Sequence, residues 1–515
     1  MLFRSIKVIM DLAELHEQEG HIEVAINYYL SLQMYNDNTR LYNYIIDSLI
    51  KVATIYLNKN DIKSVVYYIK EIHIMLEKTD YCLGWLKCQE IQVCIYEMRQ
   101  QYERAETICK NCIEMCKGEH EELKSIFYNH KGKSLVRKGR FFDAFSVLKK
   151  TIAICYKYND IDELTKALNY IGIIYAYYYQ DNNTAIKYFL KSRKVCNKSN
   201  MSNREVDASI NIATTHFLEE EYEISLQCFI EALEKCKKYE FEMKLFYCYT
   251  FIANVYLKLD DYDNVYKYYE LCKKELTNYP TQGENIEMFY LIAAEINYKL
   301  GDMQKARIYI SKVPVLSEDN KSIYLLWGQI LNECIEMYLI KNENGLIKNI
   351  KNIVMISTEI LSIGNRLNIL YGVIINLYDN GKQKYAPIII NEIKKINTDT
   401  DIKKHRVYVK KLYVDGLIGN KNSIEVFNEA LDYSKKYREI DICWKIYTSI
   451  GDCYFDKEDY LNAVIYYFEA CGILRNINFK LPIKYRLSYI GLNNALKPFN
   501  RFLGINNYYK YNKDT

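Results

Sequence analysis

Small side chains recur along this chain at a nearly constant spacing. The recurring positions are Ala25, Val65, Ala105, Ala144, Ala185, Ser225, Val265, Ala306, Leu346, Ala386, Ser423 and Ala463. Successive steps are 40, 40, 39, 41, 40, 40, 41, 40, 40, 37 and 40 residues. A fixed period of this length is typical of stacked supersecondary units, each of which contacts only its neighbours. The 515 residues therefore predict one long array rather than several globular domains.

A second periodic signal lies in the segment before each recurring small residue. There a small residue is followed three positions later by a larger one, as in Ala53 with Tyr56, Gly132 with Leu135, Gly172 with Tyr175, Ala213 with His216 and Ala253 with Tyr256. Two small positions per period predict two helices that pack closely, and a unit of this length gives each helix about 16 residues, or roughly 24 Å. The fifth period is one residue longer between Tyr175 and Ala185, and we place the extra residue in the turn at 180–183.

The stretch 451–470, GDCYFDKEDYLNAVIYYFEA, carries the most complete version of the pattern. It resembles the tetratricopeptide repeat (TPR), which has small residues at positions 8, 20 and 27, Tyr at 11 and Asp-Tyr at 16–17. The matching residues are Gly451, Ala463, Ala470, Tyr454, Asp459 and Tyr460, and Tyr467 fills aromatic position 24. This resemblance implies an all-α, right-handed α-solenoid of about twelve TPR-like helix pairs with a C-terminal capping helix. Such long repeats are similar to those of bacterial signalling and sensor proteins.

The strength of the pattern varies along the chain and suggests four regions. Residues 1–315 form an N-terminal array of about eight repeats, 316–421 hold degenerate repeats that form a bend or joint, 422–476 hold the C-terminal repeats, and 477–515 form a capping helix and tail. In the degenerate region Leu346 replaces the small residue, and the eleventh copy runs through Gly416, Gly419 and Asn420. We expect a helix to about Asn476 and another from Ile483 to about Leu496, which covers the exposed face of the twelfth repeat.

Composition and charge exclude several classes of protein. The 69 basic and 65 acidic residues nearly balance, so no electrostatic footprint indicates nucleic acid or an anionic membrane. An RNA-reading solenoid would need a period near 35 residues with basic and polar positions in register, and it is disfavoured on both counts. No apolar stretch reaches about 18 residues and no signal cleavage site is present. We expect a cytoplasmic protein whose sixteen Cys are reduced, buried thiols.

The clusters of reactive residues do not indicate catalysis or metal binding. Cys109, Cys112, Cys116 and His120 fall on one face of one expected helix, but its ends are about 16 Å apart, too far for four ligands of one ion. We interpret the three thiols as core residues, and His216 as a packed or half-buried side chain rather than a base. Nucleophile motifs, a phosphate-binding Gly loop and a nucleotide fingerprint are missing. The sequence therefore predicts no enzyme, no cofactor and no metal.

A binding groove is what the TPR resemblance does imply. In that family the first helix of each pair lines the concave face, and the matching positions give the candidate groove residues Asn129, Lys133, Arg137, Lys166, Asn169, Thr214, Thr250, Asn254, Lys258 and Tyr298. Asn side chains both donate to and accept from a peptide backbone. We expect these side chains to be exposed in the free protein. The alternative is that they are ordinary family features, because Asn254 stands where the family often has Asn.

The predicted function is a non-catalytic TPR scaffold that binds a linear peptide or partner protein, as a sensory or regulatory module in bacterial signal transduction. One alternative is a fragment of a larger kinase/ATPase, TPR and GGDEF (diguanylate cyclase) sensor, because the tail LPIKYRLSYIGLNNALKPFNRFLG is similar to a connector. Another is a peptide-pheromone receptor without its DNA-binding module, because the first repeat begins almost at Met1. Binding on the convex face remains open, and so do the identity of the partner and the oligomeric state.

Overall fold

The fold is all-α in a computed structural model, and no strand is present among the described residues. The structure describes the chain except residues 1, 36–37, 60, 117, 240, 277–283, 315–322, 341, 361, 397–404, 420–421, 493 and 512–515. By its internal contacts the chain divides into two compact units. The first holds residues up to Ile174 together with 194–200, and the second holds 175–193 and most of the chain after Met201.

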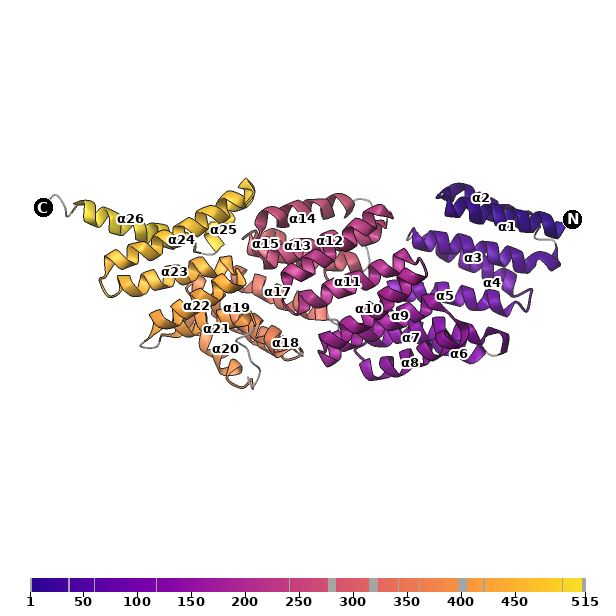
Figure 1. Ribbon diagram of the computed structural model, residues 1–515, viewed down its shortest axis with the longest axis horizontal. Coiled ribbons are helices and arrows are strands. Elements are labelled where there is room, and N and C mark those ends of the chain that lie inside the picture. Colours follow the sequence, from indigo (N-terminus) through magenta and orange to yellow (C-terminus); the bar gives the residue numbers. More distant parts are fainter. Residues whose placement is uncertain are drawn as a thin grey trace. The chain divides into compact units, whose positions relative to one another are not determined.

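The first unit is a run of helices that pack against their chain neighbours (Figure 1). They are α1 (Leu2–Gln18), α2 (Ile22–Ser31), α3 (Tyr42–Asn58), α4 (Ile62–Leu76), α5 (Cys82–Met98), α6 (Tyr102–Met115), α7 (Lys124–Arg137), α8 (Phe141–Tyr158) and α9 (Ile161–Ile174). The end of α10 (Asn182–Lys198) also belongs to this unit.

The second unit continues the same order of helices. They are α11 (Ser202–Leu218), α12 (Tyr222–Lys238), α13 (Glu242–Lys258), α14 (Tyr262–Leu276), α15 (Glu284–Lys299), α16 (Met303–Ile310), α17 (Ile323–Leu339), α18 (Glu343–Ser357), α19 (Ile363–Asp379), α20 (Ala386–Ile393), α21 (Val407–Ile418), α22 (Ser423–Tyr437), α23 (Ile440–Phe455), α24 (Tyr460–Lys480), α25 (Ile483–Leu492) and α26 (Leu496–Tyr511). The four predicted regions, the handedness and the number of repeats stay predictions.

The predicted register of small residues is confirmed at eleven of its twelve positions, because every one except Ser423 is buried. The reason is close packing within each helix pair. A Cβ atom added to Gly451 would lie 2.7 Å from the Tyr467 ring, so the small residue on α23 makes room for the aromatic on α24. Tyr467 is fully buried there, and its hydroxyl donates to Asp452 at 2.8 Å.

One tight turn joins the two helices of most repeats. Five residues before the small residue the backbone is left-handed, at Gly20, Gln100, Gly139, Gln180, Glu220, Asp260, Gly301, Gly381 and Glu458. In most of these turns the next N–H group donates to a carbonyl five residues back, as Asp261 does to Tyr256 at 3.0 Å. A residue with a side chain adopts this conformation at a cost of about 1–2 kcal/mol. The turn therefore fixes which side chains face each other across each hairpin.

The extra residue of the fifth repeat was predicted to lie in the turn at 180–183. This prediction was wrong. The Asp181 N–H donates to the Tyr175 carbonyl at 3.0 Å, six residues back instead of five, and residues Tyr175–Tyr179 form a π-helix. A π-helical turn accommodates one additional residue without ending the helix. The insertion is therefore carried at the end of the first helix of that repeat.

The eleventh repeat departs from the predicted register. Ser423 is the first residue of α22 and is only half-buried, whereas Phe427 is 2% exposed. A Cβ atom on Gly416 would lie 2.4 Å from the Phe427 ring, so the large residue of this pair packs against a glycine. The prediction that Ser423 is the small packing residue was wrong, because the register was aligned on side-chain size alone. Asn420 lies outside the described residues.

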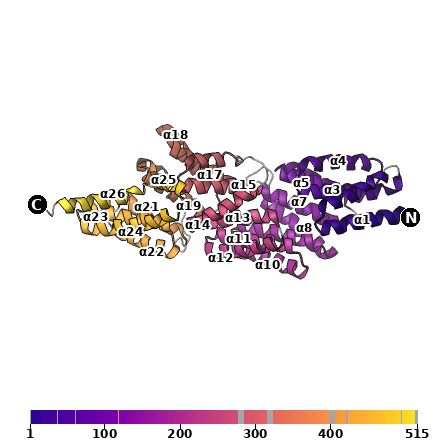
Figure 2. The same cartoon turned by 90° about the horizontal axis from the view of Figure 1, so that it is seen from above.

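The C-terminal helices also differ from the prediction. Helix α24 runs to Lys480 rather than to 476, and α25 begins at Ile483 as expected but packs on the eighth repeat instead of the twelfth. Tyr485 donates to Asn297 at 3.3 Å, and Ser488 donates to the Leu300 carbonyl at 2.8 Å. Figures 1 and 2 show α25 beside α14 and α15. The helix that packs on α24 is α26, which the sequence did not predict.

The buried register generates a stability prediction. Ala144 is fully buried between α7 and α8, so the substitution Ala144→Trp should overpack this pair and destabilise the fold by about 1–3 kcal/mol or more. The matched control is Phe142→Trp, because Phe142 is 75% exposed on the same helix. Urea unfolding followed by circular dichroism compares the two variants. Equal stabilities would contradict the packing described for this pair.

Candidate functional site

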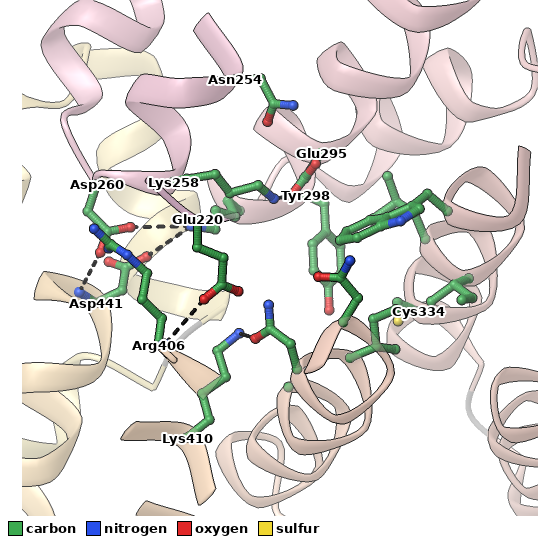
Figure 3. Close-up of a pocket in the computed structure, with 18 of the residues that line it drawn as sticks. Glu220, Asn254, Lys258, Asp260, Glu295, Tyr298, Cys334, Arg406, Lys410 and Asp441 are labelled. Atoms are coloured by element: carbon green, nitrogen blue, oxygen red, sulfur yellow. Dashed lines mark hydrogen bonds and ion pairs between the residues drawn. The ribbon is translucent and has the colours of Figure 1, made fainter. Parts of the chain in front are cut away.

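Two acidic residues connect early and late helices of the second unit. Glu220 and Asp260 occupy the left-handed position of their turns, and each carboxylate accepts a backbone N–H group from a distant helix start. Glu220 accepts from Arg406 at 3.2 Å at the beginning of α21, and Asp260 accepts from Asp441 at 3.0 Å in the first turn of α23 (Figure 3). The first N–H groups of a helix have no intrahelical acceptor and favour negative charge. These carboxylates therefore act as caps across more than 180 residues of chain.

The Asp441 carboxylate extends this closure to two further helices. It accepts the hydroxyl of Tyr262 at 2.5 Å and that of Tyr489 at 2.7 Å. Lys299 contributes a charge, with its Nζ atom 3.2 Å from Asp260. These residues come from α14, α15, α23 and α25 and from the turn before α14. One polar cluster therefore joins four helices of the unit.

The closed unit contains a cavity of about 380 Å³. Ligand pockets commonly measure about 300–1,000 Å³, so this volume suits a small ligand or a few residues of a peptide. Part of the wall is apolar and aromatic and includes Phe217, Phe251, Met288, Leu291, Trp327 and Leu331. The rest is polar, with the acids Glu220, Asp260, Glu295, Asp379, Glu439 and Asp441 and the cations Lys258, Lys299, Arg406, Lys410 and Lys445.

Lys410 differs from the other cations of the cavity wall. The four others form ion pairs, namely Lys258 with Glu295, Lys299 with Asp260, Arg406 with Glu439 and Lys445 with Asp379. Among the described residues Lys410 has no carboxylate within 4.0 Å, and its Nζ atom donates to Asn368 at 2.5 Å. Burial lowers its pKa, although the more distant Glu439 and Glu220 oppose this shift. Lys410 is therefore available to an anionic ligand group.

Asn254, in the wall of the same cavity, carries a buried and unsatisfied amide oxygen among the described residues. Its side chain is 8% exposed and its Oδ1 atom has no hydrogen-bond partner among the described residues. A buried polar atom without a partner costs about 1–3 kcal/mol. The Oδ1 atoms of Asn129 and Asn169, in the first unit, are also buried and have no hydrogen-bond partner among the described residues. Of the three residues, Asn254 lines the cavity described above.

The structure brings together only part of the predicted groove. Thr214, Asn254, Lys258 and Tyr298 line the cavity, and the Tyr298 hydroxyl accepts from Asn376 at 2.8 Å. Thr250 does not line it and donates to the Phe246 carbonyl at 2.8 Å instead.

The other five predicted residues lie in the first unit. Asn129 donates to the Glu163 carbonyl at 2.8 Å, and Lys166 pairs with Asp162 at 2.7 Å. Lys133 pairs with Glu97 at 2.8 Å, in a contact that also includes His130 at 2.9 Å. Asn169 is buried and Arg137 is half-buried. The role of these residues in binding stays a prediction.

The expectation that the groove residues are exposed was wrong for half of them. The buried ones are Asn129, Asn169, Thr214, Thr250 and Asn254. The hydroxyls of Thr214 and Thr250 then donate to carbonyls of their own helices, at 2.9 and 2.8 Å.

The sequence missed the residues that close the cavity, including Lys410 and Arg406 in the degenerate region. One signal was present, because Glu220 and Asp260 stand where several other repeats have Gly. Their partners lie five repeats further along the chain, and periodicity within one repeat gives no information on such pairs.

The Cys cluster has a different local structure from the one predicted. Helix α6 ends at Met115, so His120 lies in a separate 3-10 segment rather than on the same helix face. Cys109, Cys112 and Cys116 are fully buried among apolar side chains, as expected for core thiols. Burial raises the pKa of Cys112 to about 12 and that of Cys116 to about 11. His216 is half-buried and contacts Glu221 at 2.6 Å.

No helix in the described parts of the chain is long and apolar enough to cross a membrane.

Comparisons with known proteins concern the fold. No family model and no curated protein matches the sequence. Among solved structures, the chain is similar to NprR in complex with its cognate peptide NprX (14% identity, 68% of this chain, 98% of that chain, TM-score 0.43). It is also similar to a Rap protein complexed with competence and sporulation factor (13%, 84% and 99%, 0.33) and to the human IFIT1 dimer with PPP-AAAA (15%, 75% and 90%, 0.40).

The closing cluster generates a pH prediction. Burial, followed by the neighbouring Asp441 charge, raises the pKa of Asp260 to about 7. The folded state therefore holds a proton that the unfolded chain has already lost, so this group lowers the unfolding free energy as pH rises from about 4 to about 7, by at most about 1.4 kcal/mol per pH unit. In Asp260→Asn the amide still accepts from Asp441, and this dependence should become smaller.

Urea unfolding at pH 5 and at pH 8 measures the effect. The control is Asp263→Asn, an exposed position on α14 that should leave the difference between the two pH values unchanged. A wild-type difference that persists in Asp260→Asn would show that another group titrates.

Proposed function

We propose that this protein is a non-catalytic regulatory module that binds a short linear peptide in the cavity of its second unit. The observation that carries the proposal is Asn254, a residue of the cavity wall whose buried Oδ1 atom has no hydrogen-bond partner among the described residues. A peptide group supplies the N–H donor that this atom lacks. Ligand binding would then remove the cost of an unsatisfied polar group.

The rest of the wall supports a peptide rather than a purely apolar ligand. The aromatic part, with Phe217 and Trp327, suits an apolar side chain, whereas Lys410 suits a carboxylate. Pockets of this kind bind through apolar area and use a few placed polar groups for orientation. One short segment of peptide offers an amide, an apolar side chain and a carboxylate at once.

The first unit is a second candidate contact region in this proposal. Among the described residues the Oδ1 atoms of Asn129 and Asn169 have no hydrogen-bond partner, whereas Lys133 and Lys166 pair with acidic residues. We therefore assign peptide recognition there to the two amides first, with Lys133, Lys166 and Arg137 in supporting roles.

Affinity selection from a synthetic library of random pentapeptides with free termini, read out by mass spectrometry, tests the proposal. Asn254→Leu should weaken the selected peptides by about 1–3 kcal/mol, or roughly 5- to 150-fold. The fold should remain stable, because the amide oxygen that is removed had no partner. The control Asn428→Leu changes an exposed position on α22 and should bind as the wild type does.

A second variant tests the charge. Lys410→Gln should weaken peptides that carry a carboxylate and flatten the salt dependence of their binding, with little effect on peptides whose carboxylates are amidated. The proposal fails if no peptide is enriched over the library background. It also fails if the enriched peptides bind Asn254→Leu and Lys410→Gln as tightly as the wild type.

A further inference from the structure

The turn of the first repeat holds two histidines side by side. After α1 the backbone turns at Gly20, and the His21 N–H group donates to the His16 carbonyl at 2.8 Å. The same backbone contact recurs in the sixth repeat, where the corresponding side chains, His216 and Glu221, contact each other at 2.6 Å. The repeat geometry therefore fixes the proximity of these two positions, whatever residues occupy them.

Three ligand atoms converge at the first turn. The Nδ1 atoms of His16 and His21 are 3.5 Å apart, and Glu19 Oε2 lies 3.9 Å from the first and 3.5 Å from the second. Metal–ligand bonds of about 2.0–2.1 Å in a tetrahedral site place neighbouring ligand atoms about 3.3–3.4 Å apart. The three observed separations are close to the edges of such a tetrahedron, so small side-chain movements suffice to form it.

We propose that His16, Glu19 and His21 bind a divalent transition-metal ion of the zinc class. Two imidazoles and one carboxylate are suitable ligands for Zn²⁺, Co²⁺ or Ni²⁺, whereas Mg²⁺ and Ca²⁺ prefer oxygen ligands only. The three side chains are 27%, 51% and 61% exposed, so an ion reaches them from solvent. Three protein ligands leave one coordination position for water or for a group of a partner.

The first ligand is already oriented by its surroundings. The His16 ring stacks on Tyr28 with centroids 5.5 Å apart and planes inclined by 7°. The backbone of His21 is fixed because it caps the start of α2. The three residues follow no metal-binding sequence motif, because their proximity depends on how the chain turns between α1 and α2. The competing interpretation is a hydrogen-bonded histidine pair with Glu19 as its counter-charge.

Titration of the full chain with Co²⁺, followed by visible absorption, separates the two interpretations. The wild type should bind one ion per chain with the spectrum of a tetrahedral nitrogen and oxygen site. His21→Gln and Glu19→Gln should each weaken binding at least tenfold. The matched control is His216→Gln in the sixth repeat, which should bind Co²⁺ as the wild type does. Two ligand variants are used so that the result does not depend on the folding of one.

Each alternative outcome is distinguishable. Binding accompanied by a thiolate-to-metal charge-transfer band would assign the ion to cysteines and overturn the proposal. Binding that is equal in wild type, His21→Gln and Glu19→Gln would overturn it as well, and so would no binding at all. Zn²⁺ should compete with Co²⁺ for the site and raise the melting temperature of the wild type more than that of His21→Gln.

Discussion

The second unit depends on two carboxylates that cap helices far away in the sequence. Glu220 and Asp260 accept the backbone N–H groups of Arg406 and Asp441. Each sits in a strained left-handed turn, which would favour glycine if the turn had no other role. These two contacts attach the starts of α21 and α23 to the turns that follow α11 and α13. All four residues of these contacts line the cavity.

The connection between early and late helices also brings many charged side chains into the cavity wall. Placing six acids and five cations in one partly buried wall is unfavourable unless they pair. Nearly all the cations do pair, and Lys410 is the exception among those of the cavity wall. A half-buried cation without a carboxylate partner and an unsatisfied amide oxygen, both judged among the described residues, are unfavourable in the free protein. A ligand that satisfies both would bind and stabilise the closed form together.

The sequence predicted the parts of the fold that depend on packing inside one repeat. Ala144 and Ala463 are buried because two helices of a pair must approach closely, and that requirement is visible in a single period. The sequence-based prediction failed in the eleventh repeat, where Gly416 is the small residue of the helix pair and Phe427 is the large one. It also failed in the fifth repeat, where the extra residue lies in the π-helix that begins at Tyr175. Four of the ten predicted groove residues line the cavity. Lys410 and the capping acids could not be predicted, because their partners are set by the curvature of the whole unit.

Gly301 allows α25 to pack closely on the eighth repeat. Its backbone is left-handed, and a Cβ atom there would lie 2.3 Å from the carbonyl oxygen of Ser488 on α25. Any side chain at 301 would therefore push α25 away as well as strain the turn. The neighbouring Lys299 and the α25 residue Tyr489 both belong to the polar cluster around Asp441. Helix α25 thus packs on the eighth repeat, and its displacement would disturb the cavity wall through the hydrogen bond between Tyr489 and Asp441.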